Sequence, residues 1–98
     1  MSEIQANKKV VVDNPQGLHA RPAYLLAQMA EQFKSQVELI KDGERIDAKS
    51  ILSILTLGAA EGTEITVEAK GEDAETAVEA LCRLIEEGFP ENDAEPAA

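Results

Sequence analysis

The single histidine, His19, stands among residues that suit it to chemistry. It lies in the segment Asn14-Pro-Gln-Gly-Leu-His-Ala-Arg-Pro-Ala23, after a turn-forming cluster and directly before a run with helical spacing. Backbone N–H groups in the first turn of a helix lack intrahelical partners, and Pro22 is tolerated there for the same reason. These N–H groups and the helix dipole predict an anion site, and Arg21 adds a positive charge whose planar fork suits phosphate oxygens.

This arrangement indicates phosphoryl transfer as the candidate chemistry. A neutral imidazole can attack a phosphoryl group, and the Arg21 side chain with the backbone N–H groups of Ala20, Arg21 and Ala23 would hold the transferred charge. A structural alternative stays open, because a lone histidine before a helix often serves as a half-exposed cap and Arg21 as a surface charge. From the residues alone we infer an anion-binding histidine.

The sequence predicts neither a metal nor a cofactor. No catalytic triad is evident, and one histidine with one distant cysteine, Cys82, makes a poor metal site. Cys82 lies beside the apolar stripe of the last predicted helix, so we expect a structural thiol.

Seven elements are expected to position His19. The predicted strands span 3–12, 36–41, 44–47 and 63–70, and the predicted helices span 20–33, 51–57 and 74–87. Asp42-Gly43 suits a two-residue hairpin turn, Gly58 and Gly88 suit helix ends, and Asp73 can cap the last helix. In the last strand Ile65, Val67 and Ala69 alternate with Glu64, Thr66 and Glu68, which indicates one buried and one solvated face. The order βαββαβα predicts an α+β fold, an antiparallel sheet with helices on one face.

The composition supports one small domain with an aliphatic core. The chain has 98 residues, of which 44% are apolar but only 3% aromatic. We expect residues 1–89 to form the domain and the acidic segment 90–98, rich in proline and alanine, to be disordered. Removing 90–98 is therefore expected to leave the histidine chemistry unchanged.

The net negative charge comes from the C-terminal part of the chain. The net charge is −10, which disfavours nucleic acid as a partner. Residues 1–60 carry seven basic and seven acidic side chains, whereas residues 61–98 carry two basic and twelve acidic ones. No segment approaches the roughly 20 apolar residues of a membrane span, and residues 1–7 lack the apolar part of a signal peptide. We therefore expect a cytoplasmic protein without membrane insertion.

The predicted helix 51–57 raises two further possibilities. Ser50 precedes it, and serine is a preferred helix cap, so its presence needs no other function. Helical spacing lets Ile54 and Leu57 share the core side and leaves Ile51, Leu52 and Leu55 toward the edge or solvent. An exposed apolar patch of this kind marks a docking surface, and the alternative is a helix buried on two sides.

Two segments resemble the HPr family, the histidine-containing phosphocarriers of the bacterial phosphotransferase system. Gly17-Leu-His-Ala-Arg-Pro-Ala23 resembles the active-site motif of HPr. Asp47-Ala-Lys-Ser-Ile51, continuing to Leu57-Gly58, is similar to the regulatory-serine segment. The resemblance covers about Lys8 to Phe89 and includes the element order predicted above.

The resemblance implies a fold, a site and partners. The fold would be an open-faced sandwich, a four-stranded antiparallel sheet with three helices on one face. His19 would be phosphorylated at Nδ1 by enzyme I and would pass the group to enzyme IIA domains, with Arg21 as the active-site arginine. The protein would thus be a carrier without turnover of its own, and we expect a monomer. Ser50 would be phosphorylated by an HPr kinase/phosphorylase, and partners would dock on Leu18, Ile51, Leu52 and Leu55.

Two other functions remain open at this point. The protein could be mainly a regulatory HPr, or a nitrogen-branch paralogue, that controls other proteins through its phosphorylation state. It could also be a small interaction domain without phosphoryl chemistry. The sequence does not identify a sugar, because substrate choice in this system belongs to the membrane permeases.

Overall fold

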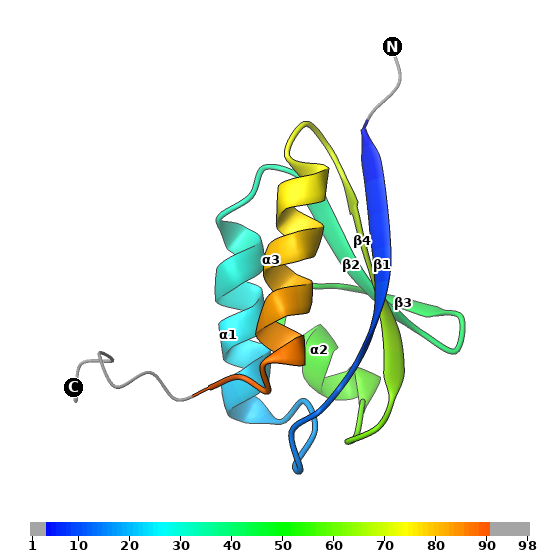
Figure 1. Ribbon diagram of the computed structural model, residues 1–98, viewed down its shortest axis with the longest axis vertical. Helices are drawn as coiled ribbons and strands as arrows, with labels where there is room; N and C mark the ends of the chain where they lie inside the picture. The colour runs from blue at the N-terminus through cyan, green and yellow to red at the C-terminus, as the bar shows by residue number, and fades with distance from the viewer. Residues whose placement is uncertain (1–3, 91–98) are drawn as a thin grey trace, which may run out of the picture.

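The computed structural model describes residues 4–90, which form four strands and three helices (Figure 1). In chain order these are β1 (Gln5–Val11), α1 (Ala20–Glu31), β2 (Gln36–Lys41), β3 (Glu44–Asp47), α2 (Ile51–Leu57), β4 (Glu64–Lys70) and α3 (Ala74–Glu86). Every predicted element is present. The first helix ends two residues earlier than expected, because the N–H groups of Gln32 and Phe33 turn back to the carbonyls of Met29 and Ala30. The start of the first predicted strand and the tail 91–98 lie outside the described residues.

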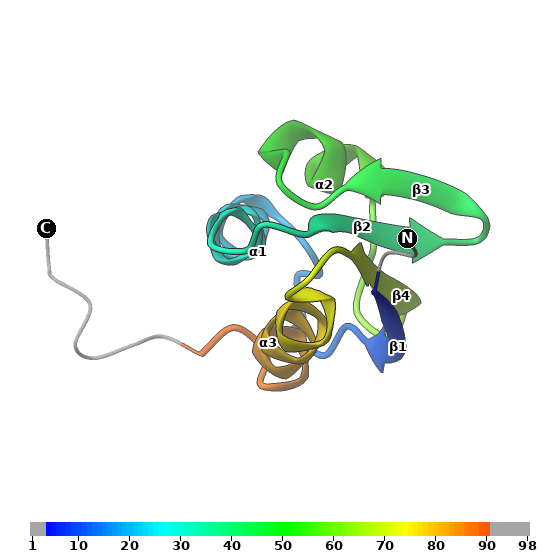
Figure 2. The same ribbon diagram turned by 90° about the horizontal axis from the view of Figure 1, so that it is seen from above.

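The strands form one antiparallel sheet in the order β1-β4-β2-β3. The edge strands are β1 and β3, and β4 lies between β1 and β2. Figure 2 shows α1 and α3 on one side of the sheet, and α2 lies beside β3 and against α1. The predicted open-faced βαββαβα sandwich is confirmed. No helix within residues 4–90 is long and apolar enough to cross a membrane.

The space between sheet and helices is filled by aliphatic side chains, as the composition predicts. Ile65, Val67 and Ala69 of β4 are at most 1% exposed. The largest fully buried aliphatic residues come from all three helices and all of the inner strands: Leu26, Leu39, Ile54, Ile65, Leu81 and Ile85. Cys82 is buried among them, and burial raises the pKa of its thiol to about 11. A thiol in this environment stays protonated at neutral pH, as a structural role requires.

Asp73 stands at the N-cap of α3, but the prediction that its side chain caps this helix is wrong. Its carboxylate instead accepts hydrogen bonds from the backbone N–H groups of Lys34 and Ser35, both at 2.9 Å, and from the Ser35 hydroxyl. These bonds, that of the hydroxyl first, lower the pKa of Asp73. The carboxylate therefore joins the α1–β2 turn to the β4–α3 turn.

Glu68 is the other polar residue whose surroundings differ from expectation. It lies on the face of the sheet away from the helices, yet only 7% of it is exposed. The Arg45 guanidinium donates to Glu68 and to Glu38 on the neighbouring strand, both at 2.9 Å. The predicted solvated face therefore carries an ion-pair cluster that covers Glu68.

Candidate functional site

His19 is the N-cap residue of α1, and its side chain is exposed. Its backbone is extended, with φ −87° and ψ −161°, and its carbonyl accepts the first bond of the helix from Ala23 at 2.9 Å. The imidazole makes no capping hydrogen bond. The helix therefore does not use the ring as a cap, and the ring is left available to a partner in solution.

The loop before His19 is fixed against the α2–β4 loop. The Leu18 N–H donates to the Ala59 carbonyl at 2.9 Å, and the Gly17 N–H closes the turn to the Asn14 carbonyl at 2.9 Å. Gly17 has φ +66°, and a Cβ there would lie 2.5 Å from the Ala59 oxygen. Only glycine fits this position, so two loops distant in sequence set the place of the histidine together.

Leu18 belongs to the core and not to the surface. It is 5% exposed and forms part of the main apolar cluster. The expectation that partners dock on Leu18 is therefore wrong. Its contribution to the site is to anchor the histidine loop from inside.

Two of the three backbone donors expected at the anion site are unoccupied. Within residues 4–90, no backbone carbonyl accepts from the N–H groups of Ala20 and Arg21. The Ala23 N–H is committed to the His19 carbonyl, so the expectation that it binds an anion is wrong. The reason is helix geometry, since the fourth residue after the cap already makes the first i to i−4 bond.

Arg21 is held by a segment that the sequence does not associate with it. Its guanidinium donates to the Phe89 carbonyl at 2.8 Å and to the Pro90 carbonyl at 3.1 Å. Arg21 is half-buried, and the contact joins the first turn of α1 to the chain that leaves α3. Arg21 and Phe89 are 68 residues apart in the sequence, so no local pattern indicates that they interact, and the sequence analysis missed both carbonyl partners.

Ser50 takes the expected position at the N-cap of α2. Its hydroxyl accepts from the Ser53 N–H at 3.1 Å. The preceding Lys49 donates from Nζ to the Phe33 carbonyl at 3.0 Å and so ties this cap to the end of α1.

The exposed face of α2 is confirmed. Ile51, Leu52 and Leu55 are 40%, 73% and 39% exposed, whereas Ile54 and Leu57 are buried. The alternative of a helix buried on two sides is excluded by these exposures.

Tyr24 on α1 is a further exposed apolar residue, at 51%, that sequence reasoning missed. A groove of about 310 Å³ runs between α1 and α2, lined by Tyr24, Ala27, Gln28, Glu31, Lys49 and Ile51. Helical spacing could have predicted this exposure, because Tyr24 falls outside the apolar stripe of α1, which comprises Ala23, Leu26, Ala27 and Ala30. Together Tyr24, Ile51, Leu52 and Leu55 form what we call the α1–α2 patch.

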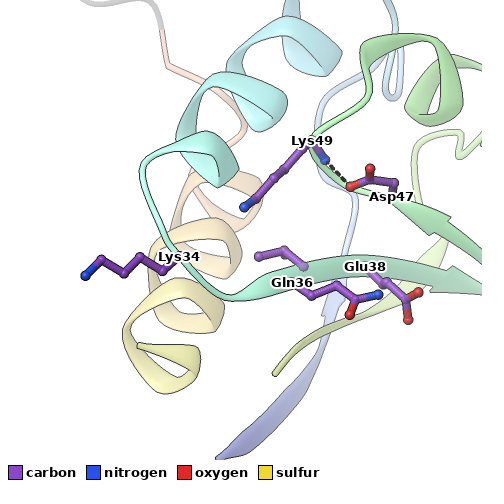
Figure 3. Close-up of a pocket in the computed structure, with 6 residues that line it drawn as sticks. Lys34, Gln36, Glu38, Asp47 and Lys49 are labelled. Atoms are coloured by element: carbon purple, nitrogen blue, oxygen red, sulfur yellow. Dashed lines mark hydrogen bonds between the residues drawn. The ribbon is translucent and has the colours of Figure 1, made fainter. Parts of the chain in front are cut away.

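A second depression lies away from His19. It has a volume of about 350 Å³ and is lined by Lys34, Gln36, Val37, Glu38, Asp47 and Lys49 (Figure 3). Lys34 and Gln36 follow the C-terminal end of α1, whereas His19 is at its N-terminal end. Its lining includes positively charged lysines and negatively charged carboxylates, and it contains no histidine. The described residues hold no cluster of three or more His, Cys, Asp or Glu side chains that could bind a metal ion.

Fold and site thus define a small α+β protein that presents one exposed histidine at a helix N-terminus, beside an arginine. Residues 6–87 match the family model described as the PTS HPr component phosphorylation site. The chain belongs to the HPr family of phosphocarrier proteins.

Curated relatives and solved structures agree with this assignment. The chain is 45% identical to the HPr-like protein Crh of Bacillus subtilis over 82% of this chain and 94% of the relative. It is 38% identical to the phosphocarrier protein HPr of Cupriavidus necator over 88% of this chain and 97% of the relative.

Two solved structures from Thermoanaerobacter tengcongensis are similar to this chain. HPr-C-His superposes with a TM-score of 0.84 at 41% identity, covering 89% of this chain and 98% of the other. An HPr described as a dimer superposes with a TM-score of 0.71 at 44% identity, covering 84% and 94%.

Proposed function

We propose that this protein carries a phosphoryl group on His19, which it accepts from phosphorylated enzyme I and passes to enzyme IIA domains for sugar uptake. The observation that supports the proposal is an exposed imidazole at the α1 N-terminus that makes no capping bond. It is accompanied by the free N–H groups of Ala20 and Arg21 and by the Arg21 side chain. These groups supply positive potential where a transferred phosphoryl group would lie.

The transfer exchanges the bond between phosphorus and the donor group of enzyme I for an N–P bond on His19. The lone pair of an unprotonated ring nitrogen attacks phosphorus, the bond to the donor group breaks, and the donor group keeps the electron pair. The family resemblance assigns the attacking atom as Nδ1. The chain needs to position the ring and stabilise the anionic phosphoryl group, and it needs no cofactor for either task.

Labelling with phosphoenolpyruvate and enzyme I tests the carrier function. The wild-type protein should acquire an acid-labile phosphate, and His19→Ala should acquire none. Ser50→Ala serves as the matched control and should be labelled like wild type. Absence of label in the wild type, or undiminished label in His19→Ala, would contradict the proposal.

A second candidate is a mainly regulatory protein, either an HPr read out through Ser50 or a nitrogen-branch paralogue. It is supported by the 45% identity to Crh, an HPr-like protein, and by the position of Ser50 at the start of a helix with an exposed apolar face. An HPr kinase/phosphorylase with ATP should then produce an acid-stable phosphate that is lost in Ser50→Ala. Failure of phosphorylated His19 to transfer to any sugar-specific IIA domain would favour this second function over the first.

We further propose that enzyme I and the IIA domains dock on the α1–α2 patch, and that the carrier is a cytoplasmic monomer. The patch lies on the helices that flank His19 and Ser50, which suits one surface for several partners. Because a related HPr is described as a dimer, the oligomeric state needs its own measurement. Sedimentation equilibrium at micromolar concentrations should give the mass of one chain, and a concentration-dependent increase to twice that mass would contradict it.

A further inference from the structure

The side chain of Arg21 ends in a fixed contact with the chain that follows α3. Both of its terminal nitrogens donate to consecutive carbonyls, Nη1 to Phe89 and Nη2 to Pro90, at 2.8 and 3.1 Å. A planar guanidinium that bonds two neighbouring acceptors has a fixed orientation, which a single bond does not give. The two carbonyls therefore determine where this charge lies at the N-terminal end of α1.

The geometry of Phe89 is what places these carbonyls. Gly88 and Phe89 both have left-handed backbones, with φ of 73° and 55°. The Gly88 N–H donates to the Ile85 carbonyl at 3.0 Å and the Phe89 N–H to the Leu84 carbonyl at 3.1 Å, a glycine-ended helix terminus that turns the chain sharply. The turn carries the segment toward the first residues of α1 (Figure 1).

The Phe89 side chain holds that turn in place. It is the only aromatic member of the buried apolar cluster in the described part of the chain, and it is 2% exposed. A left-handed backbone is unfavourable for phenylalanine, so the conformation must be maintained by packing of the ring. Burial of the Phe89 ring after α3 thus fixes the Phe89 and Pro90 carbonyls, which accept hydrogen bonds from the Arg21 guanidinium at the start of α1.

We propose that Phe89 is a positioning residue for phosphoryl transfer, and that it acts through Arg21. This inference rests on the proposed function of His19. By holding the guanidinium at the N-terminal end of α1 before a partner arrives, Phe89 removes the cost of ordering a long side chain during transfer. The N–H groups of Arg21 that do not bond the two carbonyls remain for the phosphoryl oxygens.

A double-mutant cycle of Phe89→Ala with Arg21→Ala tests the proposal on the full-length chain. In the Arg21-containing background, Phe89→Ala should slow phosphorylation of His19 by enzyme I roughly tenfold. In the Arg21→Ala background the same change should have no further effect, because the residue through which it acts is gone. Equal slowing in both backgrounds would overturn the inference.

Two variants separate positioning from a general loss of stability. Phe89→Leu keeps a buried apolar anchor and should transfer at nearly the wild-type rate. Val37→Ala removes volume from the core near the start of β2, which follows the C-terminal end of α1, whereas Arg21 lies in the first turn of that helix. It should lower stability without changing the rate. If Val37→Ala slows transfer as much as Phe89→Ala, the role of Phe89 is only structural.

The order of the Arg21 side chain gives a readout that is independent of phosphoryl chemistry. Its Nε–H signal in nuclear magnetic resonance should show a rigid group in the wild type and in Phe89→Leu, and a mobile group in Phe89→Ala. A rigid signal in Phe89→Ala would overturn the inference even if His19 is labelled normally. If the wild type is not labelled at all, the proposed carrier function fails, while a mobile signal would still show that Phe89 holds Arg21.

Discussion

At the scale of single residues, the site depends on atoms that are left unpaired. The His19 ring makes no capping bond and the N–H groups of Ala20 and Arg21 find no carbonyl in the described chain. A typical N-cap residue such as serine would satisfy one of the N–H groups with its own oxygen. Histidine at this position gives up that stabilisation, and it leaves the imidazole unpaired and two N–H groups in a position that suits an anion.

Gly17 should be among the least replaceable residues near the site. In Gly17→Ala the added Cβ would lie 2.5 Å from the Ala59 oxygen and 2.9 Å from the Ala60 Cα, both backbone atoms. With φ at +66° as well, we expect a loss of about 3 kcal/mol in the free energy of unfolding, measured with urea. Gly43→Ala is the matched control, because Gly43 has φ +83° with no atom within 4 Å, and about 1 kcal/mol is expected. Equal losses would show that the loop contact is unimportant.

Ser50 allows charge to be separated from capping. Ser50→Ala should cost about 1 kcal/mol of stability, because the Ser53 N–H loses its acceptor. Ser50→Asn and Ser50→Asp both retain a capping oxygen, and they differ only in the negative charge. We expect both to fold like wild type, and Ser50→Asp alone to be phosphorylated more slowly at His19. Equal rates in the two variants would argue against electrostatic regulation at this serine.

The candidate residues of the site lie at the helix starts where the sequence predicts them, because their signals are local. His19, Arg21 and Ser50 stand within a few residues of a helix start that the sequence marks. The hydrogen bonds from Arg21 to the Phe89 and Pro90 carbonyls have no local sequence signal, since they depend on how two helix ends meet in three dimensions. The errors at Leu18 and Ala23 have a similar origin, because burial and the first helical bond are decided by packing and backbone geometry.

At the scale of elements, the helices, the strands, the Asp42-Gly43 hairpin turn and the glycine helix ends followed from local sequence patterns, but the contacts between turns distant in sequence did not. The alternation in β4 and the apolar stripe of α3 identified the buried faces correctly. The role of Asp73 could not be predicted in this way, because an aspartate before a helix is the usual sign of a cap. In the structure the carboxylate joins two turns that are 38 residues apart.

Asp73 should make stability depend on acid pH. Its pKa is lowered, first by the Ser35 hydroxyl, so its stabilising effect is complete above the pKa of the unfolded chain, near 3.8. The effect should disappear as the pH falls through the lowered pKa of the folded state. The difference in urea midpoint between wild type and Asp73→Asn should thus be constant above about pH 5 and vanish toward strong acid. A difference that stays constant down to strong acid would contradict the assignment.

Substitutions on the exposed and buried faces of α2 should affect docking and folding separately. Leu52 is 73% exposed, so Leu52→Ser should change the free energy of unfolding by less than about 0.5 kcal/mol. If the α1–α2 patch binds partners, the same change should weaken enzyme I binding roughly tenfold in a titration. Ile54→Ala, at a fully buried position two residues away, should instead cost about 2–5 kcal/mol of stability. Unchanged affinity in a well-folded Leu52→Ser would place docking elsewhere.

At the scale of the whole molecule, the charge is divided between two ends of the chain. Residues 1–60, which carry His19, Arg21, Ser50 and α2, are balanced, and the net −10 comes from residues 61–98. Separation along the chain is not separation in space, because the contact of Arg21 with Phe89 and Pro90 brings the C-terminal end of α3, with Glu86 and Glu87, to the start of α1. The backbone N–H groups and Arg21, and not the distribution of charge along the chain, would therefore have to supply the positive potential for an anion at His19.

The structure changes where the dispensable tail is expected to begin. The sequence favours a boundary before Pro90, but the Pro90 carbonyl accepts from Arg21, so the functional unit includes this residue. Removing residues 91–98 takes away three acidic side chains and no described contact, and we expect His19 to be phosphorylated within about twofold of the wild-type rate. A chain ending at Gly88 also loses the two carbonyls that hold Arg21, and it should be clearly slower. Initial rates with enzyme I at low and high salt compare the three proteins. If the chain ending at Pro90 were already slow at both salt concentrations, the tail itself would contribute to the transfer.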